Sequence, residues 1–408
     1  MSSEHPPTSA PPLSSEHALS SAHPPPSGLP VSDPARRASG ANLPLLRGHN
    51  AAVLLGLLRA AGEGGVSRLE LAERSGLTPQ AVSKITARLR EEGLAAEAGR
   101  RASTGGKPRT VLRLVPGARH AIGLHLDRDE SVAVLADLAG EPVAVRRAPL
   151  DLGAGAEEVL AAAADRVAEV RAAAPEARVI GAGVACPGPL DHRTGVLHRV
   201  TGLPQWDGYP LRAALAERLG LPVVLDKDTN AAAHGLAQRA RGAGSFGYLH
   251  LGTGLGAGLV LGGAVHRGTR TGAGEFGHQV VQLDGPPCGC GKRGCIEALC
   301  LAAAAAGDPA EAARVLGVGA ANLVELLDVD RVLLGGRTVL ADPDTYVRGV
   351  AASLDGQLRA HGAGGARTVP VEAAPGGPHT VALGAAHLVL GTLFAAPHGP
   401  FTAARPAV

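Results

Sequence analysis

The 408-residue sequence predicts an α/β protein in which a winged helix-turn-helix module precedes a larger body of two halves. Short helices with cap residues, followed by a basic, glycine-rich hairpin, predict the module. Strands that alternate with helices from about Arg119 onward predict parallel sheets covered by helices. Apolar residues make up 45% of the chain, which is enough for a sizeable core.

The two ends of the sequence differ from the rest in composition. Residues 1–40 are mainly Ser, Pro, Ala and His, with nine prolines among the first 34. Such a segment buries too little apolar surface to offset its ordering entropy. We therefore expect a disordered tail over 1–40, a winged helix-turn-helix domain over 41–116, a body over 117–397 and a tail over 398–408. The sequence has no membrane-spanning apolar run and no signal-peptide pattern, so we expect a cytoplasmic protein with no membrane partner.

Cap residues set the boundaries of the helices in the module. The first helix is expected to start near Gly48 and to end at the glycines of 62–65. Ser67 can cap a second helix, in which Leu69 and Leu71 are expected to face inward.

A third helix is expected to begin after the cap residue Thr78, with a proline in its first position. Apolar residues at spacings of three and four give it one buried stripe: Ala81, Val82, Ile85 and Leu89. Polar residues, including Thr86, are expected on or beside the opposite face. This polar face has the dimensions and the side chains to read base edges in the major groove of DNA.

The hairpin after the third helix is basic, and so is the whole module. The segment 47–109 carries 11 Lys or Arg residues against six Asp or Glu. A basic segment on an otherwise acidic chain indicates a polyanionic partner, here double-stranded DNA. A helical dimerisation module remains the alternative. The candidate DNA-contacting residues are Thr78, Gln80, Ser83, Lys84 and Arg88 in the helix and Arg100, Arg101, Lys107 and Arg109 in the hairpin.

The body shows two strand-rich starts, near 121 and 247, each followed by helices. Strands are expected over 121–137, 179–185, 222–225, 248–263 and 330–334, and helices over 156–174, 211–219, 229–240 and 382–390. The repeated start indicates two halves of similar construction.

A metal site is predicted in the glycine-rich stretch 274–297. One imidazole and three thiolates are a complete tetrahedral set for structural zinc: His278, Cys288, Cys290 and Cys295. Ordinary cysteines or a disulfide are the alternatives, and a disulfide is disfavoured in a reducing compartment.

The same stretch carries a family resemblance. G-E-F-G-H followed by C-G-C-G-K-R-G-C-I-E resembles the zinc signature of the ROK family (repressor, open reading frame, kinase), and S-T-G-G-K-P-R resembles the wing of its regulators. The resemblance implies an actin-like, ribonuclease H-like fold shared by sugar kinases and sugar-responsive regulators. It also implies that Glu275, His278 and Glu297 face a bound sugar, and it points to a homodimer or homotetramer.

The same resemblance implies a sugar-binding role for the D-K-D-T-N segment. Asp228 matches the family's catalytic aspartate, so it is expected to bind the sugar even if it is only a vestigial base. Lys227 stands where the family usually has an asparagine that contacts sugar, so this contact differs here.

Two glycine-rich turns of the family bind phosphates, and only one is retained. L-G-T-G-L-G-A-G keeps glycines 252, 254 and 256, whereas H-L-D-R-D replaces the family's D-x-G-G-T. Asp127 and Asp129 place negative charge where phosphates would lie, which opposes phosphoryl transfer.

The sequence therefore predicts a DNA-binding regulator, a repressor, with a structural zinc, no catalytic residue and a mono- or oligosaccharide effector. The alternatives are an ATP-dependent hexose kinase with an appended domain and a DNA-binding protein that has lost its ligand.

Overall fold

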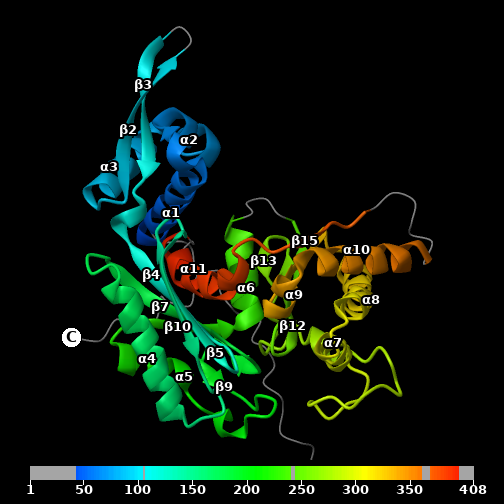
Figure 1. Cartoon of the computed structure of the whole chain (residues 1–408). Helices are drawn as coiled ribbons and strands as arrows, with labels where there is room; N and C mark the ends of the chain where they lie inside the picture. The colour runs from blue at the N-terminus through cyan, green and yellow to red at the C-terminus, as the bar shows by residue number, and fades with distance from the viewer. Residues whose placement is uncertain (1–42, 104–105, 240–243, 361–367, 395–408) are drawn as a thin grey trace, which may run out of the picture. The chain divides into compact units, whose positions relative to one another are not determined.

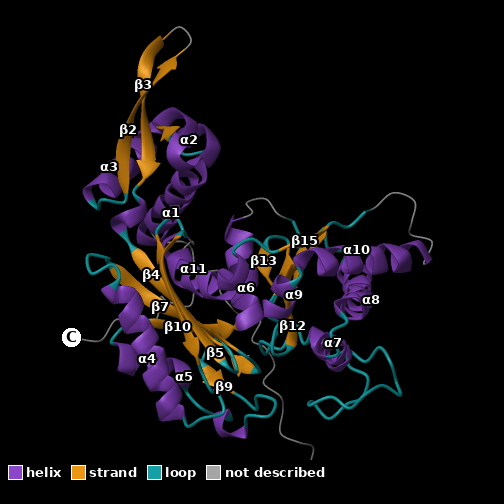
Figure 2. Ribbon diagram, in the orientation of Figure 1, coloured by secondary structure: helices purple, strands orange, loops and turns teal. Residues whose placement is uncertain are grey.

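The computed structural model describes residues 43–103, 106–239, 244–360 and 368–394. The tails expected over 1–40 and 398–408 lie outside the described residues. Figure 1 shows the chain from the N-terminal helices to the C-terminal helix, and Figure 2 shows its helices, strands and loops.

The first part of the described chain is a winged helix-turn-helix module. Its helices are α1 (Leu43–Ala61), α2 (Arg68–Ser75) and α3 (Pro79–Glu91). Its antiparallel sheet has the order β1-β3-β2, with bounds Val66–Ser67, Gly106–Leu114 and Ala95–Ser103. The strands β2 and β3 form the long hairpin of the wing (Figure 1).

The cap residues act as the sequence predicts. The Ser67 hydroxyl accepts a hydrogen bond from the Glu70 amide, and the Glu70 carboxylate accepts one from the Ser67 amide at 2.7 Å. The Thr78 hydroxyl accepts from the Ala81 amide at 3.3 Å. These capping bonds satisfy backbone amides at the helix starts, which have no carbonyl partner within the helix.

Three details of the module differ from the prediction. Helix α1 starts at Leu43 rather than near Gly48, because glycine only weakens a helix and Pro44 is tolerated in its first turn. Leu69 is 42% exposed rather than inward. Leu69 and Leu71 are two residues apart, so they point to different sides of the helix and only Leu71 faces the core. Thr86 is fully buried rather than part of the polar face, and its hydroxyl donates to the Ser83 carbonyl at 3.1 Å.

The body contains two five-stranded sheets of the same order, which confirms the expected two-half, actin-like α/β construction. The first sheet runs β6-β5-β4-β7-β10, with bounds Pro142–Pro149, Glu130–Asp137, His120–Leu126, Val179–Cys186 and Val223–Lys227. The second runs β13-β12-β11-β14-β15, with bounds Ala264–Val265, Leu255–Leu261, Phe246–Leu251, Arg331–Gly335 and Val371–Ala373. In each, an antiparallel three-strand meander continues into two parallel strands.

Helices cover both sheets (Figure 2). The first half carries α4 (Ala156–Ala172) and α5 (Leu211–Leu219), close to the expected bounds. The second half carries α7 (Ile296–Ala305), α8 (Pro309–Leu327), α9 (Arg337–Ala341) and α10 (Pro343–Ala360), which the sequence analysis did not predict. Among the described residues, no helix has the length and apolarity needed to cross a bilayer.

Two helices, α6 (Asp228–Arg239) and α11 (Thr380–Phe394), pack against each other in the body. Their close approach requires glycine: a Cβ on Gly384 would lie 2.1 Å from the Ala231 carbonyl oxygen. Likewise a Cβ on Gly123 in β4 would lie 1.8 Å from the Ala382 carbonyl oxygen. Real Cβ atoms do not come so near. This packing fixes Asp228 at the start of α6.

Candidate functional site

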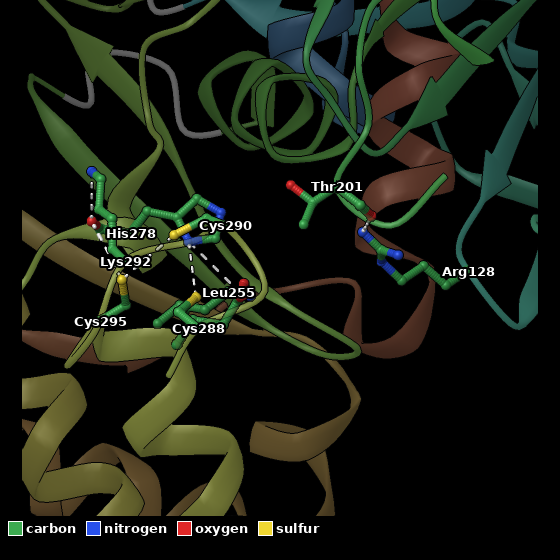
Figure 3. A network of polar contacts seen from close by, with 9 residues as sticks. Arg128, Thr201, Leu255, His278, Cys288, Cys290, Lys292 and Cys295 are labelled. Carbon is green, nitrogen blue, oxygen red and sulfur yellow. Dashed lines mark hydrogen bonds and ion pairs between the residues drawn. The ribbon is translucent and has the colours of Figure 1, made fainter. Parts of the chain in front are cut away.

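Four side chains from the stretch 274–297 converge on one point (Figure 3). The ligand atoms of His278, Cys288, Cys290 and Cys295 all lie within 4.8 Å of one another. The Cys288 Sγ is 3.7 Å from the His278 Nδ1, and the Cys290 and Cys295 sulfurs are also 3.7 Å apart. A disulfide would need about 2.05 Å, whereas tetrahedral zinc with 2.3 Å Zn–S bonds would need about 3.8 Å between sulfurs. The cluster therefore has the donor set and spacing to hold a metal ion.

Glycines and backbone hydrogen bonds shape the loop of this cluster. The Cys288 amide donates to the Lys292 carbonyl at 2.8 Å, and the Gly291 amide donates back to the Cys288 carbonyl at 3.0 Å. Gly294 has φ of 65°, and a Cβ there would lie 1.5 Å from the Gln282 carbonyl oxygen. Only glycine fits this position. Backbone hydrogen bonds and a glycine constraint therefore shape the loop that carries the cluster.

Glu297 lies between the cluster and the β11–β12 turn. Its Oε2 accepts a hydrogen bond from the Leu255 amide at 2.8 Å. Its Oε1 is 3.9 Å from the His278 Nδ1 and 3.9 Å from the Cys288 Sγ. The first turn of α7 therefore holds a half-buried carboxylate next to the retained glycine turn.

Glu275 is joined to the end of β10 through a buried lysine. The Lys227 Nζ donates to the Glu275 Oε1 at 2.7 Å and to the Gly274 carbonyl at 3.3 Å. The lysine is 5% exposed. Asp228 follows it directly and accepts a hydrogen bond from the Thr229 amide at 2.6 Å. The lysine in the family's asparagine position is thus paired with one of the expected sugar-contacting carboxylates.

The sequence analysis missed a buried ion pair beneath this segment. Asp226 is 2% exposed, and its Oδ2 accepts from the Arg267 Nε at 2.8 Å. Its Oδ1 accepts from the Lys227 amide and from the Asn230 side chain. A buried carboxylate needs such partners to stay charged. The D-K-D-T-N spacing could have indicated Asp226, but nothing local indicated Arg267, which is 41 residues away.

The H-L-D-R-D segment covers the end of β4 and the turn to β5. The side chains of its last three residues form hydrogen bonds with other parts of the chain. The Asp127 Oδ1 accepts from the Thr253 hydroxyl at 2.9 Å and from the Arg128 amide at 2.7 Å. Burial raises the pKa of Asp127, but nearby His125 and these two hydrogen bonds outweigh it, so the pKa lies below its ordinary value. The carboxylate is therefore charged at neutral pH.

A small pocket of about 50 Å³ adjoins this turn. His125, Asp127, Tyr248, His250, Gly336 and Arg337 are among the residues that line it. Burial lowers the pKa of His125, so its ring is neutral at neutral pH. The pocket thus holds charged and neutral polar groups where a phosphate-binding turn would present bare backbone amides.

The candidate DNA-contacting residues lie on α3 and the wing. Gln80, Ser83, Lys84 and Arg88 are exposed on α3, and the cap residue Thr78 is exposed at its start. Arg88 is 3.6 Å from Glu92 one turn along the helix. Arg109 is exposed on β3. Arg100, Arg101 and Lys107 lie on β2 and β3, but their side chains are outside the described part of the structure.

The fold and these sites define a class: a winged helix joined to a two-half body of the sugar kinase type with a Cys/His cluster. Comparison with known proteins agrees. Residues 121–308 match the ROK family and residues 54–95 match winged helix-turn-helix DNA-binding domains. The chain belongs to the ROK family.

Two relatives and one solved structure illustrate the similarity. The chain is 32% identical over 282 residues to the DNA-binding transcriptional dual regulator NagC of Escherichia coli K12, covering 66% of this chain and 67% of NagC. It is 31% identical over 240 residues to a putative xylose repressor of Caldicellulosiruptor, covering 57% of this chain. It thus spans only 59% of that repressor's length. A ROK family transcriptional regulator homologous to the E. coli MLC protein has the same fold, with a TM-score of 0.67, 23% identity and coverage of 86% of this chain and 97% of the regulator.

Proposed function

We propose that this chain is a transcriptional regulator, a repressor, whose winged helix binds operator DNA under the control of a carbohydrate bound in the body. One observation carries the proposal: a single chain combines an exposed polar helix in a winged helix with a ROK-type body whose polar side chains gather beside a Cys/His cluster. Its relatives named as a xylose repressor and as NagC support the same assignment.

In this proposal, α3 enters the major groove of operator DNA. Gln80, Ser83 and Lys84 are exposed and carry the donors and acceptors that read base edges. Arg88 and Arg109 contact phosphates, together with Arg100, Arg101 and Lys107 of the wing. Because Arg88 already has Glu92 as a neighbour, its contribution to affinity is expected to be smaller than that of Lys84.

The effector site is proposed to include Asp228, Glu275, His278 and Glu297, whose polar atoms suit ring hydroxyls. Lys227 belongs to the same group because its ammonium holds Glu275. Relatives are named as a putative xylose repressor and as an N-acetylglucosamine repressor, so these sugars come first in any effector panel.

The Cys/His cluster is proposed to hold a structural zinc. Three thiolates and one imidazole leave no open coordination position, so the metal would brace the loop rather than activate water. It would also fix the orientation of the His278 ring, whose other nitrogen would then face the sugar.

Kinase activity is not proposed. In the β4–β5 turn Asp127 and Arg128 stand at the glycine positions of the family's D-x-G-G-T and Asp129 at the threonine position, and Asp127 remains charged. Phosphoryl transfer needs developing negative charge to be neutralised, and these carboxylates do the opposite. We further propose that the protein acts as a homodimer or homotetramer in the cytoplasm, because one recognition helix covers only a few base pairs.

The test uses the full chain. Binding sequences are selected from a random duplex library, and affinity for the best one is measured by fluorescence anisotropy with and without xylose, N-acetylglucosamine and glucose. We expect one sugar to change the DNA affinity by about tenfold or more, the coupling typical of an effector. Failure to select any sequence would contradict the proposal.

Matched variants separate the two sites. Lys84→Ala is expected to lose about 1–3 kcal/mol of discrimination between sequences, whereas Lys107→Ala weakens binding to all sequences alike. Glu275→Ala is expected to bind DNA normally but to ignore the sugar. Glu311→Ala, an exposed acid on α8, is the control that keeps both properties.

A further inference from the structure

The three residues of the β4–β5 turn each bond to a different distant segment of the body. Asp127 bonds to Thr253, which is 126 residues away. Arg128 bonds to the Thr201 carbonyl, 73 residues away, and Asp129 bonds to Arg337, 208 residues away. A turn whose only task is to reverse the chain needs no such partners.

The strongest of these bonds crosses from the first sheet to the second. Asp127 follows β4, and Thr253 lies in the turn between β11 and β12. The carboxylate is 8% exposed, so its hydrogen bond at 2.9 Å is screened little by water. A hydrogen bond to a charged group that is this buried is stronger than one between neutral groups.

A second bond crosses between the halves at the surface. The Arg337 guanidinium at the start of α9 donates to the Asp129 Oδ2 at 2.7 Å. This bond to Asp129 raises the pKa of Arg337. The two side chains are 47% and 54% exposed, so this ion pair is expected to contribute less than the buried bond of Asp127.

The third bond joins Arg128 of the turn to Thr201 in the 198–203 loop (Figure 3). The Arg128 guanidinium donates to the Thr201 carbonyl at 2.7 Å. A Cβ built on Gly289, between two of the cluster cysteines, would lie 3.6 Å from the Thr201 Cγ2. Thr201 is therefore the neighbour of Gly289 on this side of the cluster loop, and its carbonyl accepts from Arg128.

We propose that the turn Asp127–Asp129 is a latch that holds the two halves of the body together. Its two carboxylates bind Thr253 and Arg337 of the second half, and its arginine binds the 198–203 loop of the first half. Separation of the two halves must break the bonds of Asp127 and Asp129 together.

The test is hydrogen–deuterium exchange on the full-length protein. Thr253→Val removes only the hydroxyl donor. The reporters are amides bonded to the turn's carbonyls, Leu150 and Leu152, and the Leu203 amide in the 198–203 loop. We expect about tenfold or faster exchange at all three, because a hydrogen bond to a charged group is lost. Leu203 decides the matter, since loosening confined to the β11–β12 turn would leave it unchanged.

Arg337→Ala keeps the test decisive if Thr253→Val folds poorly. Because its ion pair is exposed, we expect about two- to fivefold faster exchange at the same amides. Arg314→Ala is the matched control, since Arg314 pairs with Glu311 on the same helix of one half. Exchange in α3 serves as an internal reference. Unchanged exchange at Leu150, Leu152 and Leu203 in both variants, or equal acceleration in the control, would overturn the latch.

Discussion

The β4–β5 turn and the β11–β12 turn occupy equivalent positions in two sheets of the same strand order, yet they are built in opposite ways. The β11–β12 turn keeps three glycines within 252–256, and its neighbours lie close to the bare backbone. The β4–β5 turn carries three charged side chains, each with a distant partner. One topology can therefore present either an open backbone or a set of clamping side chains, and the residues in the turn decide which.

The largest expected effect concerns the half that has the glycine turn, because the zinc proposed for the Cys/His cluster would brace it. Cys290→Ser removes one ligand, so the stabilisation that a structural zinc provides is lost. We expect a loss of several kcal/mol of unfolding free energy and a fall in zinc content, measured by thermal denaturation and metal analysis. The control is Cys300→Ser, a buried cysteine that bonds to the Ala312 carbonyl instead. Freshly purified protein without zinc would refute the metal assignment.

The next effect concerns the clamping turn. Asp127→Ala leaves the Thr253 hydroxyl and the Arg128 amide without their acceptor. Loss of a buried charged acceptor is expected to lower the unfolding free energy by about 1–3 kcal/mol in denaturant titration. Asp129→Ala should cost less than about 1 kcal/mol, since its ion pair is half-exposed. Equal losses in the two variants would mean that burial does not separate the two bonds.

A smaller effect is expected in the glycine turn. A Cβ on Gly254 would lie 3.1 Å from the Glu297 Oε2, which accepts from the Leu255 amide. Gly254→Ala should therefore displace this carboxylate by a few tenths of an ångström and cost about 1 kcal/mol, since core overpacking starts near that value. If Glu297 contacts the effector, the sugar affinity measured by calorimetry should fall while DNA affinity is unchanged. Gly262→Ala is a control for the loss of a glycine nearby, although its φ of 58° adds backbone strain.

The smallest effect is a pH dependence. The pKa of Asp127 is lowered on folding from its ordinary value of 3.8, so its contribution to stability is present above that value. The contribution is lost as pH falls through the still lower folded pKa. The stability difference between the protein and Asp127→Asn should thus hold from pH 7 to about 4 and shrink only below that. A difference that disappears between pH 7 and 5 would show that another group is responsible.

Where the chemistry is local, sequence and structure agree closely. The capping box of Ser67 and Glu70 spans three residues, and its bonds form as expected. The metal-ligand set spans 278–295, and its spacing alone was enough to place four ligand atoms together. In the first half, α4 and α5 were predicted close to their observed bounds, whereas β6 was not predicted. Helices α7–α10 were not predicted either, although Tyr346, Val350 and Leu354 of α10 recur every four residues.

Where a polar side chain has several possible partners, only the tertiary structure showed which partner it bonds to. The sequence showed charged residues at 127–129, but not that Asp127 would bond to Thr253 and Asp129 to Arg337. It showed Lys227 in place of an asparagine, but not its bond to Glu275. It placed Thr86 beside the polar residues of α3, although packing buries it completely. The sequence by itself determined the family, the winged helix, the cap positions and the metal-ligand set, because these depend on contacts within one turn or one loop. The tertiary structure determined which charged side chains pair between the two halves of the body. Those contacts join segments up to 208 residues apart, so no local sequence pattern marks them.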